Sequence, residues 1–272
     1  MSPLRRTLLA VLAATLLLPA TAQDSVEADR SEIEALVLRF MKDRSFPDWK
    51  ERYTGDMRLF ARRPTPGASY HDDKYEAVIR VNEQDETSAA VAVAMVDANK
   101  KHSDFYLFLR KEDDVWKLAA VRTFAPPRGT GQMYAALAAK GKDITKADMR
   151  ELGILQVLQF SDFGLKQSFE QRRERLDKIA DIVSSKGVGD IIHGSTHHSR
   201  IDKDLWQEVH DAGLNYVEQR ESGVIDFNGA SFGESAVGFF YVPSGAKPPR
   251  ATPDDYVLVE PLEGEWYLYR KQ

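Results

Sequence analysis

The fold is decided by residues 75–124, which read YEAVIRVNEQDETSAAVAVAMVDANKKHSDFYLFLRKEDDVWKLAAVRTF. The stretch is rich in Val, Ile, Ala, Phe and Tyr in strand-like patterns, which is typical of β-structure. It predicts strands at Tyr75–Val81, Thr87–Asp97, Asp104–Arg110 and Val115–Phe124. The polar segments between them are so short that neighbouring strands must run antiparallel. We therefore expect a meander of long strands.

The segment before the meander is predicted to be mainly helical. Its apolar residues recur at the spacing of one helix face. They are Ile33, Leu36, Val37, Phe40 and Met41. Ser31 and Glu34 have the form of a capping box at the start of this helix. A second short helix is predicted over Phe46–Tyr53, and a strand around Arg58–Arg62. Two helices can cover only one face of the meander. A curved sheet wrapped around them is therefore expected.

This layout resembles the NTF2-like superfamily, which includes SnoaL-like and ketosteroid-isomerase-like proteins. The residues that carry the resemblance are the opening helix 31–44 and the hairpin 104–118, DFYLFLRKEDDVWKL, within a matching region of roughly 31–124. The resemblance implies a cone-shaped α+β domain. Enzymes of this kind usually hold an Asp, His or Tyr inside the cone, sometimes on the first helix. The apolar stripe of this chain's first helix has no titratable residue, so those roles have no matching position.

A linker is predicted at residues 126–131, PPRGTG, because Pro and Gly interrupt regular structure. It would separate an NTF2-like domain at 23–125 from a second α+β domain at 132–272. The second domain is predicted as helices over 132–219 followed by antiparallel strands over 223–270. No family is recognised for this half.

The second half carries its own start and stop signals. Thr145 and Asp148 resemble the cap of a helix that ends at Gly153, and a longer helix is predicted to stop at Gly187. The ending 256–268, YVLVEPLEGEWYL, repeats the order strand, acidic turn, Trp, strand. It fits a diverged duplication of the first half, and equally the ordinary appearance of a terminal hairpin.

Residues 1–22 are predicted to be a Sec signal peptide. Arg5 and Arg6 supply the positive region, Leu8–Leu18 the apolar run, and Ala20–Ala22 the small residues before cleavage. As a helix this run reaches only about 16 Å, which is too short to span a bilayer. The mature protein is expected to begin at Gln23, without a membrane anchor, in the periplasm or the medium.

Composition excludes several classes of protein. The chain has no cysteine, which excludes a lipoprotein anchor, disulfides and thiolate chemistry. Its formal net charge is −5, and no basic run interleaved with aromatic residues is present. Nucleic acid is therefore not an expected partner. No Gly-rich phosphate loop or dinucleotide motif occurs, and no cofactor is predicted.

The histidines are the first candidates for chemistry. Four of the six fall between His193 and His210, and His193, His197 and His198 have spacing that zinc ligands can use. Residues 194–196, GST, disfavour the helix that would present them together, and no HExxH motif is present. A polar loop is the preferred interpretation, and no metal is predicted.

Asp104 and Tyr106 are the only candidate catalytic residues, and they are weak ones. They share one face of a predicted strand with Arg110, and Arg122 could face the same way. An Asp beside a Tyr could act as a general base with a hydrogen-bond donor. The favoured alternative has Asp104 capping a turn and Tyr106 packing on Phe108. The sequence thus leans against an enzyme.

Elimination favours a non-catalytic binding role. The leading hypothesis is an exported immunity protein or inhibitor that binds a secreted toxin or a cell-wall hydrolase. Trp206 could be its anchor, because its neighbours in sequence are polar, and His197 and His198 could lie in the same contact surface. The alternative is a small-molecule-binding protein, or an isomerase- or cyclase-like pocket enzyme, that uses the NTF2-like cone.

Overall fold

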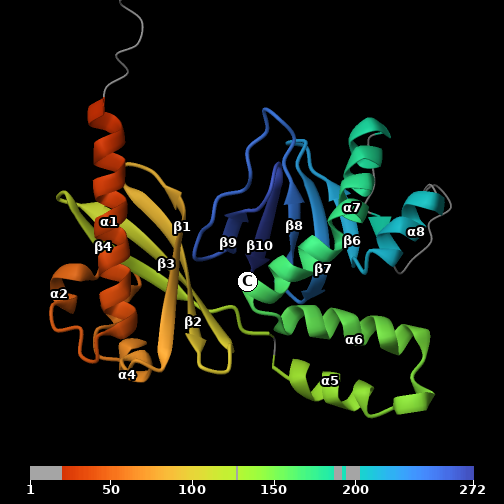
Figure 1. Cartoon of the computed structure of the whole chain (residues 1–272), viewed down its shortest axis with the longest axis horizontal. Coiled ribbons are helices and arrows are strands. Elements are labelled where there is room, and N and C mark those ends of the chain that lie inside the picture. Colours follow the sequence, from red (N-terminus) through yellow and green to blue (C-terminus); the bar gives the residue numbers. More distant parts are fainter. Residues whose placement is uncertain (1–19, 127, 187–191, 194–202) are drawn as a thin grey trace, which may run out of the picture.

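A computed structural model describes residues 20–126, 128–186, 192–193 and 203–272. The chain is α+β, with helices packed on two antiparallel sheets (Figure 1). The first sheet has the order β1-β2-β3-β4, which confirms the predicted meander. Its strands are β1 (Tyr75–Gln84), β2 (Ser88–Asp97), β3 (His102–Glu112) and β4 (Val115–Arg122).

One long helix, α1 (Ala20–Lys42), lies across one face of the first sheet (Figure 1). The predicted apolar stripe of α1 is buried, and it packs against the β2 and β3 side chains that point the same way, such as Val93 and Leu107. The predicted capping box at Ser31 is wrong, because the helix already runs from Ala20. Favourable helix formers upstream continue the helix past Ser31, whose side chain stays exposed.

Three one-turn helices connect α1 to the meander. They are α2 (Trp49–Arg52), α3 (Met57–Phe60) and α4 (Gly67–Tyr70). The strand predicted around Arg58–Arg62 is therefore wrong. Residues 57–60 form one turn of helix in which only Met57 is buried, whereas a strand on this sheet would bury alternate side chains. The predicted helix over Phe46–Tyr53 is confirmed in its second half as α2.

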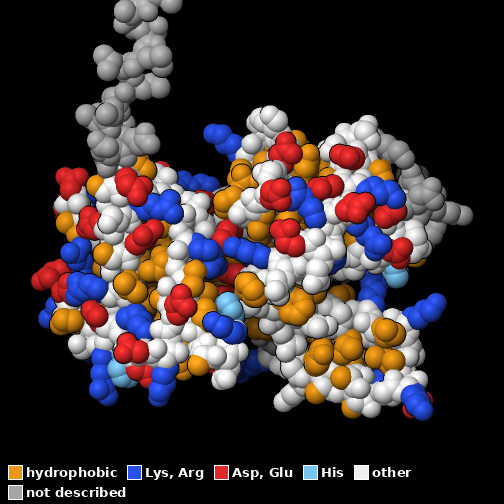
Figure 2. Space-filling view, in the orientation of Figure 1, with side chains coloured by type: hydrophobic (Ala, Val, Ile, Leu, Met, Phe, Trp, Pro, Cys, Tyr) orange, Lys and Arg blue, Asp and Glu red, His pale blue; other side chains and the backbone are white. Residues whose placement is uncertain are grey.

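The described part of the second half contains four α-helices, with a short 3-10 helix at Gly141–Asp143 between the first two. They are α5 (Thr130–Ala138), α6 (Lys146–Gln159), α7 (Asp162–Lys186) and α8 (Lys203–Asp211). The predicted capping box of Thr145 and Asp148 is present at the start of α6. The predicted stop at Gly153 is wrong, because α6 continues to Gln159, and its buried residues Leu155 and Leu158 stabilise the last turn. Figure 2 shows hydrophobic side chains gathered on the outside of the α5–α6 hairpin.

The second sheet has the order β5-β6-β7-β8-β10-β9, with all pairs antiparallel. Its strands are β5 (Ile192–His193), β6 (Tyr216–Gln219), β7 (Ile225–Phe232), β8 (Ser235–Tyr241), β9 (Tyr256–Pro261) and β10 (Trp266–Lys271). β5 and β6 correct the prediction that 132–219 is only helical. Residues 216–219 extend because they pair with β7, with Val217 facing the core.

The two halves pack directly on each other. One apolar core contains the outer face of the first sheet, including Ala90, Ala92 and Phe108, together with α7 and the inner face of the second sheet. Small alanines on β2 allow this close approach. A separate core lies between α1 and the first sheet. None of the helices within the described residues has the length and apolar composition needed to cross a membrane.

Candidate functional site

The main candidate site is a cavity of about 640 Å³ between α1 and the first sheet. We call it the α1–sheet cavity. Its walls come from α1, α3, α4, β3 and β4 and are mainly aromatic and aliphatic. The principal apolar lining residues are Phe40, Tyr53, Met57, Phe60, Tyr70 and Phe105. A largely apolar cavity of this size, with a few polar groups, is typical of a small-molecule site.

Aromatic contacts hold the walls in place. The rings of Phe40 and Tyr53 meet edge to face at 6.1 Å, and Tyr53 stacks on Phe46 at 5.6 Å. On the opposite wall, Tyr70 meets Phe105 edge to face at 5.7 Å. Such pairs add stability beyond their apolar burial. The cavity is therefore bounded by rings that support one another.

The backbone at Gly67 fixes the position of α4 against the end of α1. A Cβ atom at this position would lie 1.9 Å from the carbonyl oxygen of Asp43, so only glycine fits. Lys42 Nζ adds hydrogen bonds to the carbonyl oxygens of Asp72 and Tyr75, at 2.7 and 2.8 Å. These contacts place Tyr70 at the cavity wall.

The polar side chains of the cavity differ in whether they already bind other groups of the protein. Arg122 donates to Pro253 O at 3.0 Å and to Asp56 Oδ2 at 2.8 Å, so its guanidinium is engaged. Arg63 lies over the Phe60 ring at 4.9 Å and makes no ion pair with the described residues. Burial raises the pKa of Tyr53 to about 12, so its hydroxyl stays protonated at neutral pH.

The described side chains that line the α1–sheet cavity include no Asp, Glu or His. Proton abstraction at neutral pH usually needs one of these groups or a lysine with a lowered pKa. The arrangement can hold an apolar molecule and donate hydrogen bonds to it.

Asp104 and Tyr106, the candidates from the sequence, lie on the opposite face of the first sheet, against the second half. Tyr106 donates from its hydroxyl to Asp162 Oδ1 at 2.8 Å. Asp104 Oδ2 accepts from the backbone N–H of Asp162 at 3.0 Å, at the first turn of α7. The two side chains are brought together, but they join the halves of the protein and do not face the α1–sheet cavity.

Asp162 is the centre of a group of charged residues that we call the interface network. Its carboxylate accepts from Arg270 Nε at 2.7 Å and from Arg80 Nη2 at 2.9 Å. Glu260 lies 2.8 Å from Arg80 Nε and accepts from Lys166 Nζ at 2.6 Å. Burial, and then the Asp162 charge, raise the pKa of Asp104, and burial raises the pKa of Tyr106 well above its usual value.

The remaining predicted residues are spread over the region around α8. Trp206 is half-buried on α8 and stacks on His210 at 5.6 Å. His197 and His198 lie outside the described residues, and so does the predicted stop at Gly187. Within the part of the chain that is described, no three His, Asp or Glu side chains form a group that could hold a metal ion.

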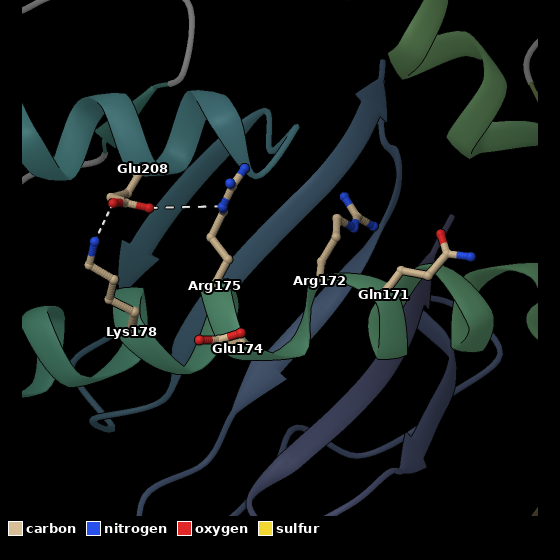
Figure 3. Close-up of a pocket in the computed structure, with 6 residues that line it drawn as sticks. All are labelled: Gln171, Arg172, Glu174, Arg175, Lys178 and Glu208. Carbon is tan, nitrogen blue, oxygen red and sulfur yellow. Dashed lines mark hydrogen bonds and ion pairs between the residues drawn. The ribbon is translucent and has the colours of Figure 1, made fainter.

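A second cavity, of about 480 Å³, lies between α7 and α8 and is polar (Figure 3). Its charges are largely paired with one another. Glu208 forms ion pairs with Lys178 and, at 3.9 Å, with Arg175. Arg172 donates to Ala212 O at 2.9 Å, and burial lowers the pKa of Arg172. These pairs tie α8 to α7, so we assign this cavity a structural role.

Comparison with protein-family models, with curated proteins and with solved structures gives no match for this chain. The candidate site therefore rests on its own geometry. Sequence reasoning did not select Arg63, Tyr70 or the other residues that close the α1–sheet cavity. The signal available was the proline pair Pro64 and Pro66 beside aromatic residues, which marks an irregular segment but does not place it.

Proposed function

We propose that this protein is an exported, non-catalytic binding protein for a small, largely apolar molecule held in the α1–sheet cavity. The supporting observation is the cavity itself, of about 640 Å³, with aromatic walls and no Asp, Glu or His side chain in its described lining. The proposal keeps the non-catalytic role predicted from sequence and takes the small-molecule alternative for the ligand. Binding to a toxin or hydrolase through Trp206 stays a prediction.

The proposal includes two further parts that extend the sequence analysis. The first half is proposed to be an NTF2-like cone, which the packing of α1 inside a four-stranded meander supports. Residues 1–22 are proposed to be removed during export, which the charged, apolar and small-residue segments of the N-terminus support.

The direct test is binding of N-phenyl-1-naphthylamine, an uncharged apolar probe that fluoresces when it leaves water. Ser69 is exposed at the rim of the cavity, so Ser69→Trp is expected to block the mouth at little cost to folding. We expect at least about tenfold weaker probe binding, equivalent to about 1.4 kcal/mol. Ser184→Trp, at an exposed serine of α7, is the matched control and is expected to bind as the parent does.

Native mass spectrometry of the purified protein should in parallel reveal a small molecule that Ser69→Trp no longer carries. The proposal is wrong if the parent binds no apolar probe and carries no small molecule. It is also wrong if Ser69→Trp and Ser184→Trp bind the probe equally well. Turnover of a bound compound would instead favour the pocket-enzyme alternative.

A further inference from the structure

The α3 segment combines exposed apolar side chains with a local excess of positive charge. Residues 57–63 read MRLFARR. Leu59 is 83% exposed and Phe60 is 37% exposed. Single exposed apolar residues are ordinary on protein surfaces. A Leu-Phe pair between arginines, on a chain of net charge −5, is a more specific combination. We call residues 57–63 the α3 patch.

The arginines of the α3 patch are available to an outside partner. Arg58, Arg62 and Arg63 are exposed, and none forms an ion pair with the described residues. Two carboxylates beside the patch already have partners: Asp56, which precedes it in the chain, and Glu112, on which the charge of Arg58 acts. Asp56 accepts from Arg122 at 2.8 Å. Glu112 accepts from Thr54 at 2.5 Å and from Lys117 at 3.1 Å. The hydrogen bond from Thr54 lowers the pKa of Glu112 and the charge of Arg58 adds to this effect, but none of the three arginines is held in an ion pair with a described residue.

The α3 patch also borders the mouth of the α1–sheet cavity. Phe60 and Arg63 belong to the patch and line the cavity as well. A surface that covers the patch would consequently lie across the cavity opening. An apolar molecule could then pass between that surface and the cavity without crossing water.

We propose that the α3 patch docks the protein on an anionic lipid bilayer. Arginine guanidinium groups bind lipid phosphates, and Leu59 and Phe60 can enter the boundary between headgroups and acyl chains. We favour a lipid surface because exposed apolar anchors flanked by unpaired cations match what an anionic headgroup boundary binds. Docking stands without a bound ligand; only the passage of a molecule into the cavity rests on the proposed function.

The test is sedimentation of the protein with phosphatidylcholine vesicles that either contain or lack phosphatidylglycerol. The protein is purified from the cell that produces it, with or without residues 1–22, in whichever form that cell accumulates. The parent is expected to bind only vesicles that contain phosphatidylglycerol, and more weakly as salt is added. Each arginine near such a surface strengthens binding about fivefold. Arg58→Gln/Arg62→Gln should therefore lower the partition coefficient about 25-fold. Leu59→Ser should lower it about tenfold, because an apolar anchor is lost.

The matched control is Lys142→Gln/Lys146→Gln, which removes two exposed lysines that have no ion pair within the described residues. It should bind vesicles as the parent does. Neither Arg58 nor Arg62 lines the cavity, so their double variant should also keep binding of N-phenyl-1-naphthylamine. That readout separates failure of docking from failure of the proposed ligand site.

Two results would overturn the docking proposal. One is a parent protein that ignores vesicles containing phosphatidylglycerol, or an arginine variant that binds them no worse than the lysine control. The other is binding of soluble polyglutamate, lost in the arginine variant, in the absence of vesicle binding. The second result would assign the α3 patch to an acidic protein partner.

Discussion

Removal of the Asp162 carboxylate should weaken the interaction between the two halves and lower the stability of the protein. Asp162 is 1% exposed and accepts hydrogen bonds from Tyr106, Arg80 and Arg270. Arg270 is itself only 2% exposed. In Asp162→Ala its buried guanidinium would lose the carboxylate that it pairs with. It would keep a hydrogen bond to the carbonyl oxygen of Phe160, at 2.6 Å, the Phe124 ring at 4.7 Å and the charge of Asp104.

The expected loss of stability follows from the buried charge of Arg270 that loses its ion-pair partner. Removing one partner of a buried ion pair costs about 3–5 kcal/mol. We expect Asp162→Ala to lower the free energy of unfolding by that amount. Asp162→Asn keeps the size and one acceptor oxygen but loses the charge, so about 1.5–3 kcal/mol is expected, the range for hydrogen bonds to charged groups.

The assay is urea unfolding followed by far-ultraviolet circular dichroism, with the free energy taken from the midpoint and slope. Asp181→Asn is the matched control, since Asp181 is exposed on the same helix. Its effect should stay within about 0.5 kcal/mol. Hydrogen exchange in Asp162→Asn should show faster exchange first in β3 and β10, the strands that carry Tyr106 and Arg270.

A loss below about 1 kcal/mol in Asp162→Ala would refute this account, because a buried guanidinium could then not depend on Asp162. If Asp162→Ala does not fold, Asp162→Asn provides the measurement. A second, separate transition in either variant would indicate that each half retains its own stability once the interface network is weakened.

Three further predictions concern a pKa, a backbone contact and export. The pKa of Asp104 is raised in the folded protein, so folding favours its protonated form, and stability falls as pH rises above the unfolded value of about 4. Asp104→Asn should flatten that fall in urea titrations at successive pH values. An unchanged dependence of stability on pH would contradict this prediction. Gly67→Ala should cost about 1–3 kcal/mol because its Cβ would collide with backbone, whereas Gly131→Ala, which meets no atom within 4 Å, should change the melting temperature little. Leu12→Arg should leave unprocessed precursor in the cytoplasm, because a charge in the apolar run opposes insertion by about 2.5–3.5 kcal/mol. N-terminal sequencing of the parent protein should find Gln23 as its first residue. A chain in the envelope that retains residues 1–22 would count against the signal peptide.

The meander and the main helices could be predicted because their sequence periods are strong and local. The stripe of α1 reports one buried face, and the long apolar run of β2 reports a strand that is buried on both faces. The one-turn helix α3 could not be predicted in the same way. Four residues are too few to show a helical period, and Leu59 looks like a strand residue although it is exposed.

The candidate site was harder to predict than the fold. Asp104 and Tyr106 were found because they share a strand face, but which face points toward α1 depends on the whole sheet. Val121 and Phe105 face the cavity, whereas Tyr106 and Asp104, in alternate positions, face the second half. A period of two identifies both faces without saying which one another domain will cover.

The interface network also affects the order in which the protein can fold during synthesis. Asp162 and Arg270 are separated by 108 positions along the chain. Until the second half folds, the outer face of the first sheet lacks its partners, so Ala90, Ala92 and Phe108 would face solvent. Contacts between distant positions slow folding. The first half should therefore expose an apolar surface that chaperones can bind until the second half has folded onto it.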